Sequence, residues 1–306
     1  MGRRGRAPLR PGHRRAAVRG ARAGWLGLPF LLGAFLVVLL PLGLAAYLAF
    51  TDYYGFEAPR WSGTDNWARL AGDGQFWRSV GVTGVVAAIA VPIRIALAVG
   101  AALLLARQGG AAGAIGRTAA YLPSVVPEAA WALLWLWILN PLYGPLPAAL
   151  RAVGAPVPGF LTEPWGARWG LVLVLAFQVG EAFVVALAAR RTVPGALYDA
   201  LAVEGASPWF TTTRLTLPVM APILLLLTVR DLVVVVQNAF VPALLVTGGG
   251  PGNATLTAPL LVYERAFEYG ELGYASTLSV ALLVLTAAAA ALPLWLAARL
   301  AQRQRR

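Results

Sequence analysis

The residue types that most often carry out chemistry in proteins are scarce in this sequence of 306 residues. There is no cysteine, and the single histidine, His13, lies in an Arg-rich N-terminal segment, so the chain offers no thiol nucleophile and no imidazole cluster. Lysine is also absent, and a Walker A loop needs a lysine to reach the phosphates. The carboxylates within apolar segments are isolated from one another. We therefore predict no catalytic residues, no metal site, no cofactor and no enzymatic activity.

The apolar residues come in blocks long enough to cross a membrane. Apolar types make up 59% of the chain and charged residues only 12%, which leaves too little polar surface for a soluble fold. About 20 helical residues cross the hydrocarbon. We therefore predict an all-α, polytopic membrane helix bundle with six transmembrane helices, the fifth of which is long enough to tilt or to leave the hydrocarbon at its ends. The predicted spans are residues 25–50, 79–106, 118–139, 169–189, 215–246 and 272–298.

The arginines outside these runs predict the orientation, because cytoplasmic loops are enriched in basic residues. The first 24 residues hold eight arginines and no acid. With this segment inside, 17 arginines lie on the cytoplasmic side and six on the outer side. We therefore predict that both termini and the loop at 190–216 are cytoplasmic.

Residues 1–24 form a basic tail ahead of the transmembrane domain at 25–306. The apolar run after the tail exceeds the 7–15 residues of a signal-peptide core, so we interpret it as an uncleaved anchor. The basic cluster would suit nucleic acid or the anionic headgroups of membrane lipid. We favour lipid and predict no nucleic-acid partner.

The loop at 190–216 carries the signals of two short helices with a break between them. Pro194 can open the first helix in its first turn, and Gly205 can close it in a left-handed conformation. Ser207 and Pro208 are suited to the N-cap and first position of the second helix. We therefore predict a helix–Gly–helix elbow.

This elbow resembles the EAA loop of ABC-importer permeases, in which Glu-Ala-Ala is followed after three residues by Gly and later by a Leu-Pro pair. Here the run LYDALAVEGAS at 197–207 is followed by Leu217-Pro218. Asp199 replaces the Glu, Leu201 replaces the second Ala, and Glu204 stands where Asp is usual. The resemblance implies that this loop couples the chain to an ATPase. The residues implied in coupling are Asp199, Ala200, Leu201, Glu204, Gly205 and Ala206.

Further segments resemble the MalF-type sugar permeases in the same order along the chain. They are AFTDY at 49–53, FWR at 76–78, LP at 122–123, LWLWILNP at 134–141, VTGGGPGNAT at 246–255, AF at 266–267 and GYAS at 273–276. The Gly-rich run permits backbone turns that other residues resist. It falls on the predicted outer side, away from ATP. The chain is similar to the shorter, six-span members of the group.

The resemblance implies a permease subunit of an ABC type I importer in a bacterial inner membrane, for a sugar or sugar-like solute. The implied partners are two ABC ATPase subunits, a second homologous permease subunit and an extracytoplasmic solute-binding protein. By the same resemblance, the fourth and fifth spans contact the solute, and we predict a substrate pathway at Gln178, Glu181, Gln237 and Asn238. Gln178 and Glu181 are three residues apart and should share a helix face. Hydrogen bonding between helices is the alternative role for all four.

The charges inside the apolar runs suggest ion pairs, because a lone charge in hydrocarbon is costly. We expect Arg94 to pair with Glu128, or Arg230 with Glu181. Arg230 and its neighbour Asp231 should not face each other. A proton-coupled secondary transporter that uses Glu128, Glu181 and Asp231 as a relay is the alternative function.

Overall fold

The computed structural model describes residues 28–303, and within them the chain is a bundle of helices with one two-stranded hairpin. Four helices are long and apolar enough to cross a membrane, and six spans result if each of two bent helix pairs counts as one. The four are Leu28–Leu48, Gly74–Leu105, Pro208–Thr247 and Leu272–Arg299. The predicted basic tail at 1–24 lies outside the described residues.

The chain passes through its elements in a simple order. The first span ends as α2 (Leu40–Leu48), the strands β1 (Thr51–Asp52) and β2 (Arg60–Trp61) pair antiparallel, and α3 (Asp65–Gly72) leads into α4 (Gly74–Leu105). The middle of the chain forms α5 (Gly110–Tyr121), α6 (Glu128–Ile138), α7 (Pro145–Ala152), α8 (Pro164–Ala176) and α9 (Gly180–Arg191). The remainder forms α10 (Gly195–Val203), α11 (Pro208–Thr211), α12 (Leu217–Asn238), α13 (Phe240–Pro242), α14 (Ala258–Tyr263) and α15 (Leu272–Arg303).

Helix α4 is the centre of the bundle and packs against α8, α9 and α12. Small side chains on the facing surfaces, such as Ala98 and Ala102 of α4 and Ala182 and Ala186 of α9, are fully buried. Small residues let the backbones of membrane helices approach closely. The close packing of α4 against α9 and α12 therefore fixes the positions of the polar residues that α9 and α12 carry.

The third predicted span, 118–139, is not a single straight helix. Helix α5 continues into a 3-10 turn at Leu122–Ser124, and the chain then bends by 98° across residues 125–127 before α6 begins. Pro127 occupies the N-cap position of α6 in an extended conformation. Proline has no N–H to donate and disfavours helix in the residue before it, so the helix cannot continue through this point.

The fourth predicted span, 169–189, is also broken, with a bend of 51° between α8 and α9. Gly180 at the start of α9 lies against the first break, because a Cβ added there would be 2.5 Å from Ser124 Oγ and 2.7 Å from the Tyr121 carbonyl oxygen. The two breaks therefore pack against each other, and a side chain at position 180 would separate them.

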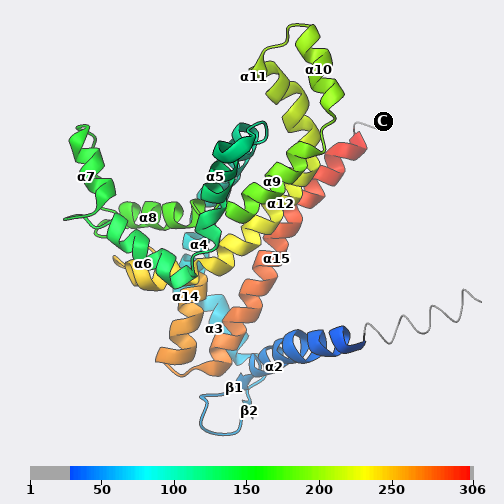
Figure 1. Cartoon of the computed structure of the whole chain (residues 1–306). Coiled ribbons are helices and arrows are strands. Elements are labelled where there is room, and N and C mark those ends of the chain that lie inside the picture. The colour runs from blue at the N-terminus through cyan, green and yellow to red at the C-terminus, as the bar shows by residue number, and fades with distance from the viewer. Residues whose placement is uncertain (1–27, 304–306) are drawn as a thin grey trace, which may run out of the picture.

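The two ends of the bundle differ in character (Figure 1). Helices α10 and α11 form a hairpin that protrudes at one end, near the C-terminal end of α15. The β1–β2 hairpin lies at the opposite end of the molecule. Helix α2 diverges from the bundle and contacts α15, and no residue of its most apolar stretch is buried in the chain.

Candidate functional site

The α10–α11 hairpin has the elbow geometry that its sequence predicts. Gly205 is in the left-handed conformation with φ +74°, and the Ala206 N–H donates to the Leu201 carbonyl at 2.9 Å, which closes α10. Ser207 Oγ accepts from the Phe210 N–H at 3.2 Å and caps α11, which begins at Pro208. Pro194 itself precedes α10 rather than lying inside its first turn.

The hairpin exposes apolar side chains together with two carboxylates. Val203 is 90% exposed and Trp209 is 78% exposed, and Leu197 and Phe210 are also exposed. Of the predicted coupling residues, Asp199, Ala200, Glu204 and Gly205 are exposed, while Leu201 and Ala206 are partly covered. Large exposed apolar groups on a protruding segment are typical of a surface that binds another protein. Val203 and Trp209 were missed from the sequence because exposure is not visible there.

Tyr198 fixes the hairpin to the bundle, and sequence analysis did not single it out. Its hydroxyl lies 2.8 Å from Thr216 Oγ1, just before α12. The guanidinium carbon of Arg190, in the last turn of α9, lies 4.1 Å from the centre of the Tyr198 ring. Such cation–π contacts are attractive by about 0.5–1 kcal/mol or more. A force on α10 would therefore be transmitted to both α9 and α12.

A four-residue ion network joins α4, α9 and α12 within the bundle. Arg94 Nε lies 3.2 Å from Asp231 Oδ2, and both side chains are almost fully buried. Arg230 Nη1 lies 2.9 Å from Asp231 Oδ1, and Arg230 also pairs with Glu181. The buried charges of Arg94 and Asp231 offset each other, as a low-dielectric interior requires, whereas Arg230 and Glu181 are about half exposed.

The network confirms one expectation from the sequence and overturns two. Arg230 does pair with Glu181, whereas Arg94 pairs with Asp231 on α12 and not with Glu128. Arg230 and Asp231 were expected to point apart, but the long Arg230 side chain reaches its neighbour's carboxylate. The proton-relay hypothesis loses support, because arginines hold two of its three carboxylates, Glu181 and Asp231.

The four predicted pathway residues do not form one cluster. Gln178 lies in the break between α8 and α9, so the expectation that it shares a helix face with Glu181 was wrong. Glu181 and Arg230 line a surface hollow with Tyr121. Gln237 lines a separate groove of about 470 Å³ against α14 and α15, and Asn238 is the last residue of α12. The hollow and the groove share no lining residue.

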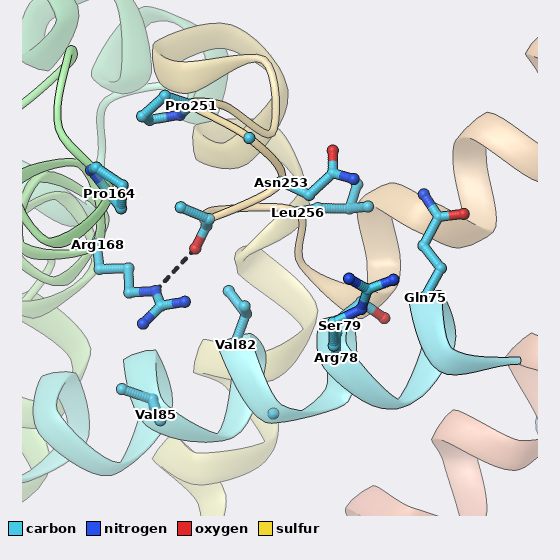
Figure 2. A pocket seen from close by; sticks show the side chains of 13 residues that line it. Gln75, Arg78, Ser79, Val82, Val85, Pro164, Arg168, Pro251, Asn253 and Leu256 are labelled. Atoms are coloured by element: carbon cyan, nitrogen blue, oxygen red, sulfur yellow. Dashed lines mark hydrogen bonds between the residues drawn. The ribbon is translucent and has the colours of Figure 1, made fainter.

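A cavity of about 700 Å³ lies between α4, α8 and the Gly-rich loop that follows residue 247 (Figure 2). Its polar lining comes from Gln75, Arg78, Ser79, Arg168 and Asn253, with no carboxylate among the residues that line it. Figure 2 shows Arg168 reaching from α8 toward α4, with its Nε donating to the Ala254 carbonyl at 2.9 Å. This donor-rich cavity was not predicted from the sequence.

The Gly-rich loop that forms one wall of this cavity is internally braced. Gly248, Gly249 and Gly252 all have positive φ, as the sequence predicts for such a run. Thr255 Oγ1 donates to the Gly250 carbonyl at 2.6 Å, and Thr83 Oγ1 on α4 accepts from the Ala258 N–H at 2.8 Å. The loop is therefore a fixed surface at the end of the bundle away from the α10–α11 hairpin.

These features define a polytopic helical membrane protein with a protruding helical hairpin at one end and a polar cavity at the other. Residues 95–306 match the family described as the binding-protein-dependent transport system inner membrane component. The chain belongs to this family and is a membrane-spanning permease component of such a system.

Relatives and solved structures agree with that assignment. The chain is similar to the probable ABC transporter permease protein YesP of Bacillus subtilis, at 32% identity over 84% of each protein. It is also 31% identical to the diacetylchitobiose uptake system permease protein NgcF of Streptomyces coelicolor, over 88% of this chain and 79% of that one. A crystal structure of a bacterial ABC transporter that imports alginate contains a chain with the same fold, with a TM-score of 0.77 at 21% identity, covering 93% of this chain and 98% of that one.

Proposed function

We propose that this chain carries a sugar or sugar-like solute across the bacterial inner membrane as one permease of a binding-protein-dependent, ATP-driven importer. The observation that carries the proposal is the α10–α11 hairpin, with Val203 and Trp209 exposed beside Asp199 and Glu204. A short helix with a few apolar anchors is suited to a groove on a partner protein. In this account the partner is the ATPase, present as two subunits, and a second permease completes the channel.

The names of relatives support the solute class. Proteins similar to this chain are described as permeases for starch degradation products, diacetylchitobiose, and trehalose and maltose. The hydroxyl-rich solutes named there need side chains that both donate and accept hydrogen bonds, which is the property of Gln178, Gln237 and Asn238. We assign these three residues and Glu181 to the solute pathway, to which the hollow at Glu181 and the groove at Gln237 would contribute.

The opposite end of the bundle is proposed to receive the solute-binding protein. The cavity beneath the Gly-rich loop is large and lined by hydrogen-bond donors, and the braced loop gives a partner a rigid surface. In this account the loop at 190–216 and both termini are cytoplasmic, which follows from the distribution of arginines. The basic tail at 1–24 would then lie against anionic lipid.

Docking of the ATPase can be tested by copurification. Replacing Val203 and Trp209 by Asp should remove the ATPase subunits from the purified complex, because buried charges oppose an apolar contact. The matched control is Val153→Asp, which changes a side chain that is 77% exposed at the end of α7. Retention of the ATPase by the Val203→Asp/Trp209→Asp variant at wild-type levels would refute the proposed docking site.

The orientation can be tested by cysteine labelling, since the chain has no native cysteine. Single cysteines at Ala202 and Gly110 should react with membrane-impermeant reagents only from the cytoplasmic side. Cysteines at Gly63 and Asn253 should react only from outside. Outside labelling of Ala202→Cys would contradict the proposed topology, because the hairpin could not then reach an ATPase.

A further inference from the structure

A second polar cavity, of about 330 Å³, lies behind the α10–α11 hairpin where α4 and α9 end. Its lining includes Arg107, just after α4, and Arg190, in the last turn of α9. Tyr198 of α10 and the threonines Thr211, Thr212 and Thr216 complete its polar wall, and no carboxylate is among the lining residues. The cavity is therefore cationic and belongs neither to the solute pathway nor to the exposed docking face.

Both arginines lie against the ring of Tyr198, and neither has an acidic partner among the described residues. Their guanidinium carbons lie 5.5 Å and 4.1 Å from the centre of the same Tyr198 ring, so they are no farther apart than the sum of these distances. Within the described residues, no carboxylate oxygen lies within 4.0 Å of a nitrogen of either arginine. At roughly one Debye length or less, two like charges repel. An anion bound between them would offset that repulsion.

The chemistry of the lining specifies the anion. Guanidinium groups bind phosphate oxygens through paired hydrogen bonds, and a threonine hydroxyl can add another donor. Leu104, which also lines the cavity, is 72% exposed and lies in the last turns of the span α4. An apolar side chain at this point would contact an acyl chain whose headgroup lies beside the arginines.

We propose that this cavity binds a phosphate-bearing anion, held by Arg107 and Arg190 and in contact with α4, α9 and α10. The source of the phosphate is an anionic lipid headgroup or free phosphate. Occupancy would hold the base of the hairpin against the ends of two spans. If the hairpin docks the ATPase as proposed, the bound anion would change how efficiently movements of the ATPase are transmitted to the bundle.

The test measures binding by native mass spectrometry of the purified transporter in detergent, titrated with phosphatidylglycerol and, in parallel, with zwitterionic phosphatidylcholine. Each arginine should contribute roughly fivefold to affinity for an anionic headgroup, so the variant Arg107→Gln/Arg190→Gln should weaken phosphatidylglycerol binding roughly 25-fold. The control variant Arg191→Gln/Arg214→Gln removes the same charge at the same end of the bundle, from residues that do not line the cavity. It should leave the affinity unchanged.

Two further variants keep the test decisive if the double glutamine variant fails to fold. Arg107→Lys/Arg190→Lys should retain most of the binding because it keeps the charge. Ala202→Glu, which places a carboxylate on the cavity wall, should abolish binding while both arginines remain. This variant changes an exposed position of α10.

The source of the phosphate is decided by competition with inorganic phosphate. Displacement of phosphatidylglycerol by millimolar phosphate, lost in the double glutamine variant, would assign the site to free phosphate. Binding of phosphatidylglycerol that phosphate does not displace would assign it to lipid. Equal phosphatidylglycerol binding by the wild type, the double glutamine variant and Ala202→Glu, without any effect of phosphate, would overturn the proposal. Equal losses in the glutamine variant and its control would do the same. None of these measurements depends on transport.

Discussion

Substitutions at Gly205 should disturb coupling in proportion to the backbone strain that they introduce. The residue has φ +74°, and a Cβ added there would meet no atom within 4 Å, so strain alone sets the cost. An L-residue in the left-handed region is disfavoured by roughly 1–2 kcal/mol, asparagine by less, and a β-branched residue by more. A penalty of about 2 kcal/mol lowers the ratio of native to alternative hairpin conformations roughly 30-fold. We therefore expect the effect to rise from Gly205→Asn through Gly205→Ala to Gly205→Val.

The assay compares the variants as purified complexes. Insertion should be unchanged because no span is altered, whereas copurification of the ATPase and solute-stimulated ATP hydrolysis should fall along the series. Gly195→Val is the control, since Gly195 opens the same helix, has no positive φ and would also meet nothing within 4 Å. Wild-type coupling in Gly205→Val, or equal losses in Gly205→Asn and Gly205→Val, would refute the strain argument.

Three other predictions concern the bundle and its stability. Asp231→Asn should lower the free energy of unfolding by about 3–5 kcal/mol because it leaves Arg94 buried without its partner. The double variant Arg94→Met/Asp231→Leu should lower that free energy far less. Equal melting temperatures for the single and double variants would contradict this prediction. Gly180→Ala should destabilise the protein by about 1–3 kcal/mol, because the added methyl group clashes with the Tyr121 carbonyl. Gly84→Ala, whose added methyl group meets no atom within 4 Å, should leave stability unchanged. Thermal unfolding in detergent measures both effects. Burial alone would raise the pKa of Asp73, but the hydrogen bonds from Tyr274 and from the Phe76 and Gln75 N–H groups hold that pKa below its usual 3.8. These hydrogen bonds therefore stabilise the folded protein above pH 3.8, and their contribution is lost as the pH falls below that value. Asp73→Ala should remove this pH dependence of the free energy of unfolding. A pH profile of stability that is the same in the variant and the wild type would contradict the role given to Asp73.

The parts of the site that could be predicted from sequence are those with local signals. The elbow at Gly205 depends on a glycine that accepts positive φ and on the Ser207-Pro208 pair that starts α11, and both act within a few residues. The turns of the Gly-rich loop follow for the same reason. In each case the conformation is a property of the segment itself.

The parts that could not be predicted depend on contacts between distant segments. Hydropathy measures the length of an apolar run but not its bends, so the breaks in the third and fourth spans were missed. Pro127 was an available signal for the first break. The second has no proline and is accompanied by the packing of Gly180 against Tyr121 and Ser124. The pairing of Arg94 with Asp231 joins α4 to α12, and a single sequence does not reveal which distant charges meet.

The roles of single side chains were also incomplete without the structure. Tyr198 stands next to the predicted coupling residues, yet its contacts to Arg190 and Thr216 appear only once α9, α10 and α12 are assembled. Arg168 lies on an apolar helix, and its role as a brace for the Gly-rich loop depends on a carbonyl 86 positions away. Sequence motifs therefore located the proposed docking segment, while the structure was needed to find the residues that hold it in place.

We propose that this chain moves its solute only when ATP hydrolysis acts through the α10–α11 hairpin. The most direct test of this proposal is uptake of labelled solute into proteoliposomes that contain the complete transporter, with ATP on the hairpin side and loaded binding protein on the other. We expect ATP-dependent uptake by the wild type, uptake by Val153→Asp at the wild-type rate, and none by Val203→Asp/Trp209→Asp. Uptake driven by a proton gradient with this chain alone, in the absence of any ATPase subunit, would contradict the account.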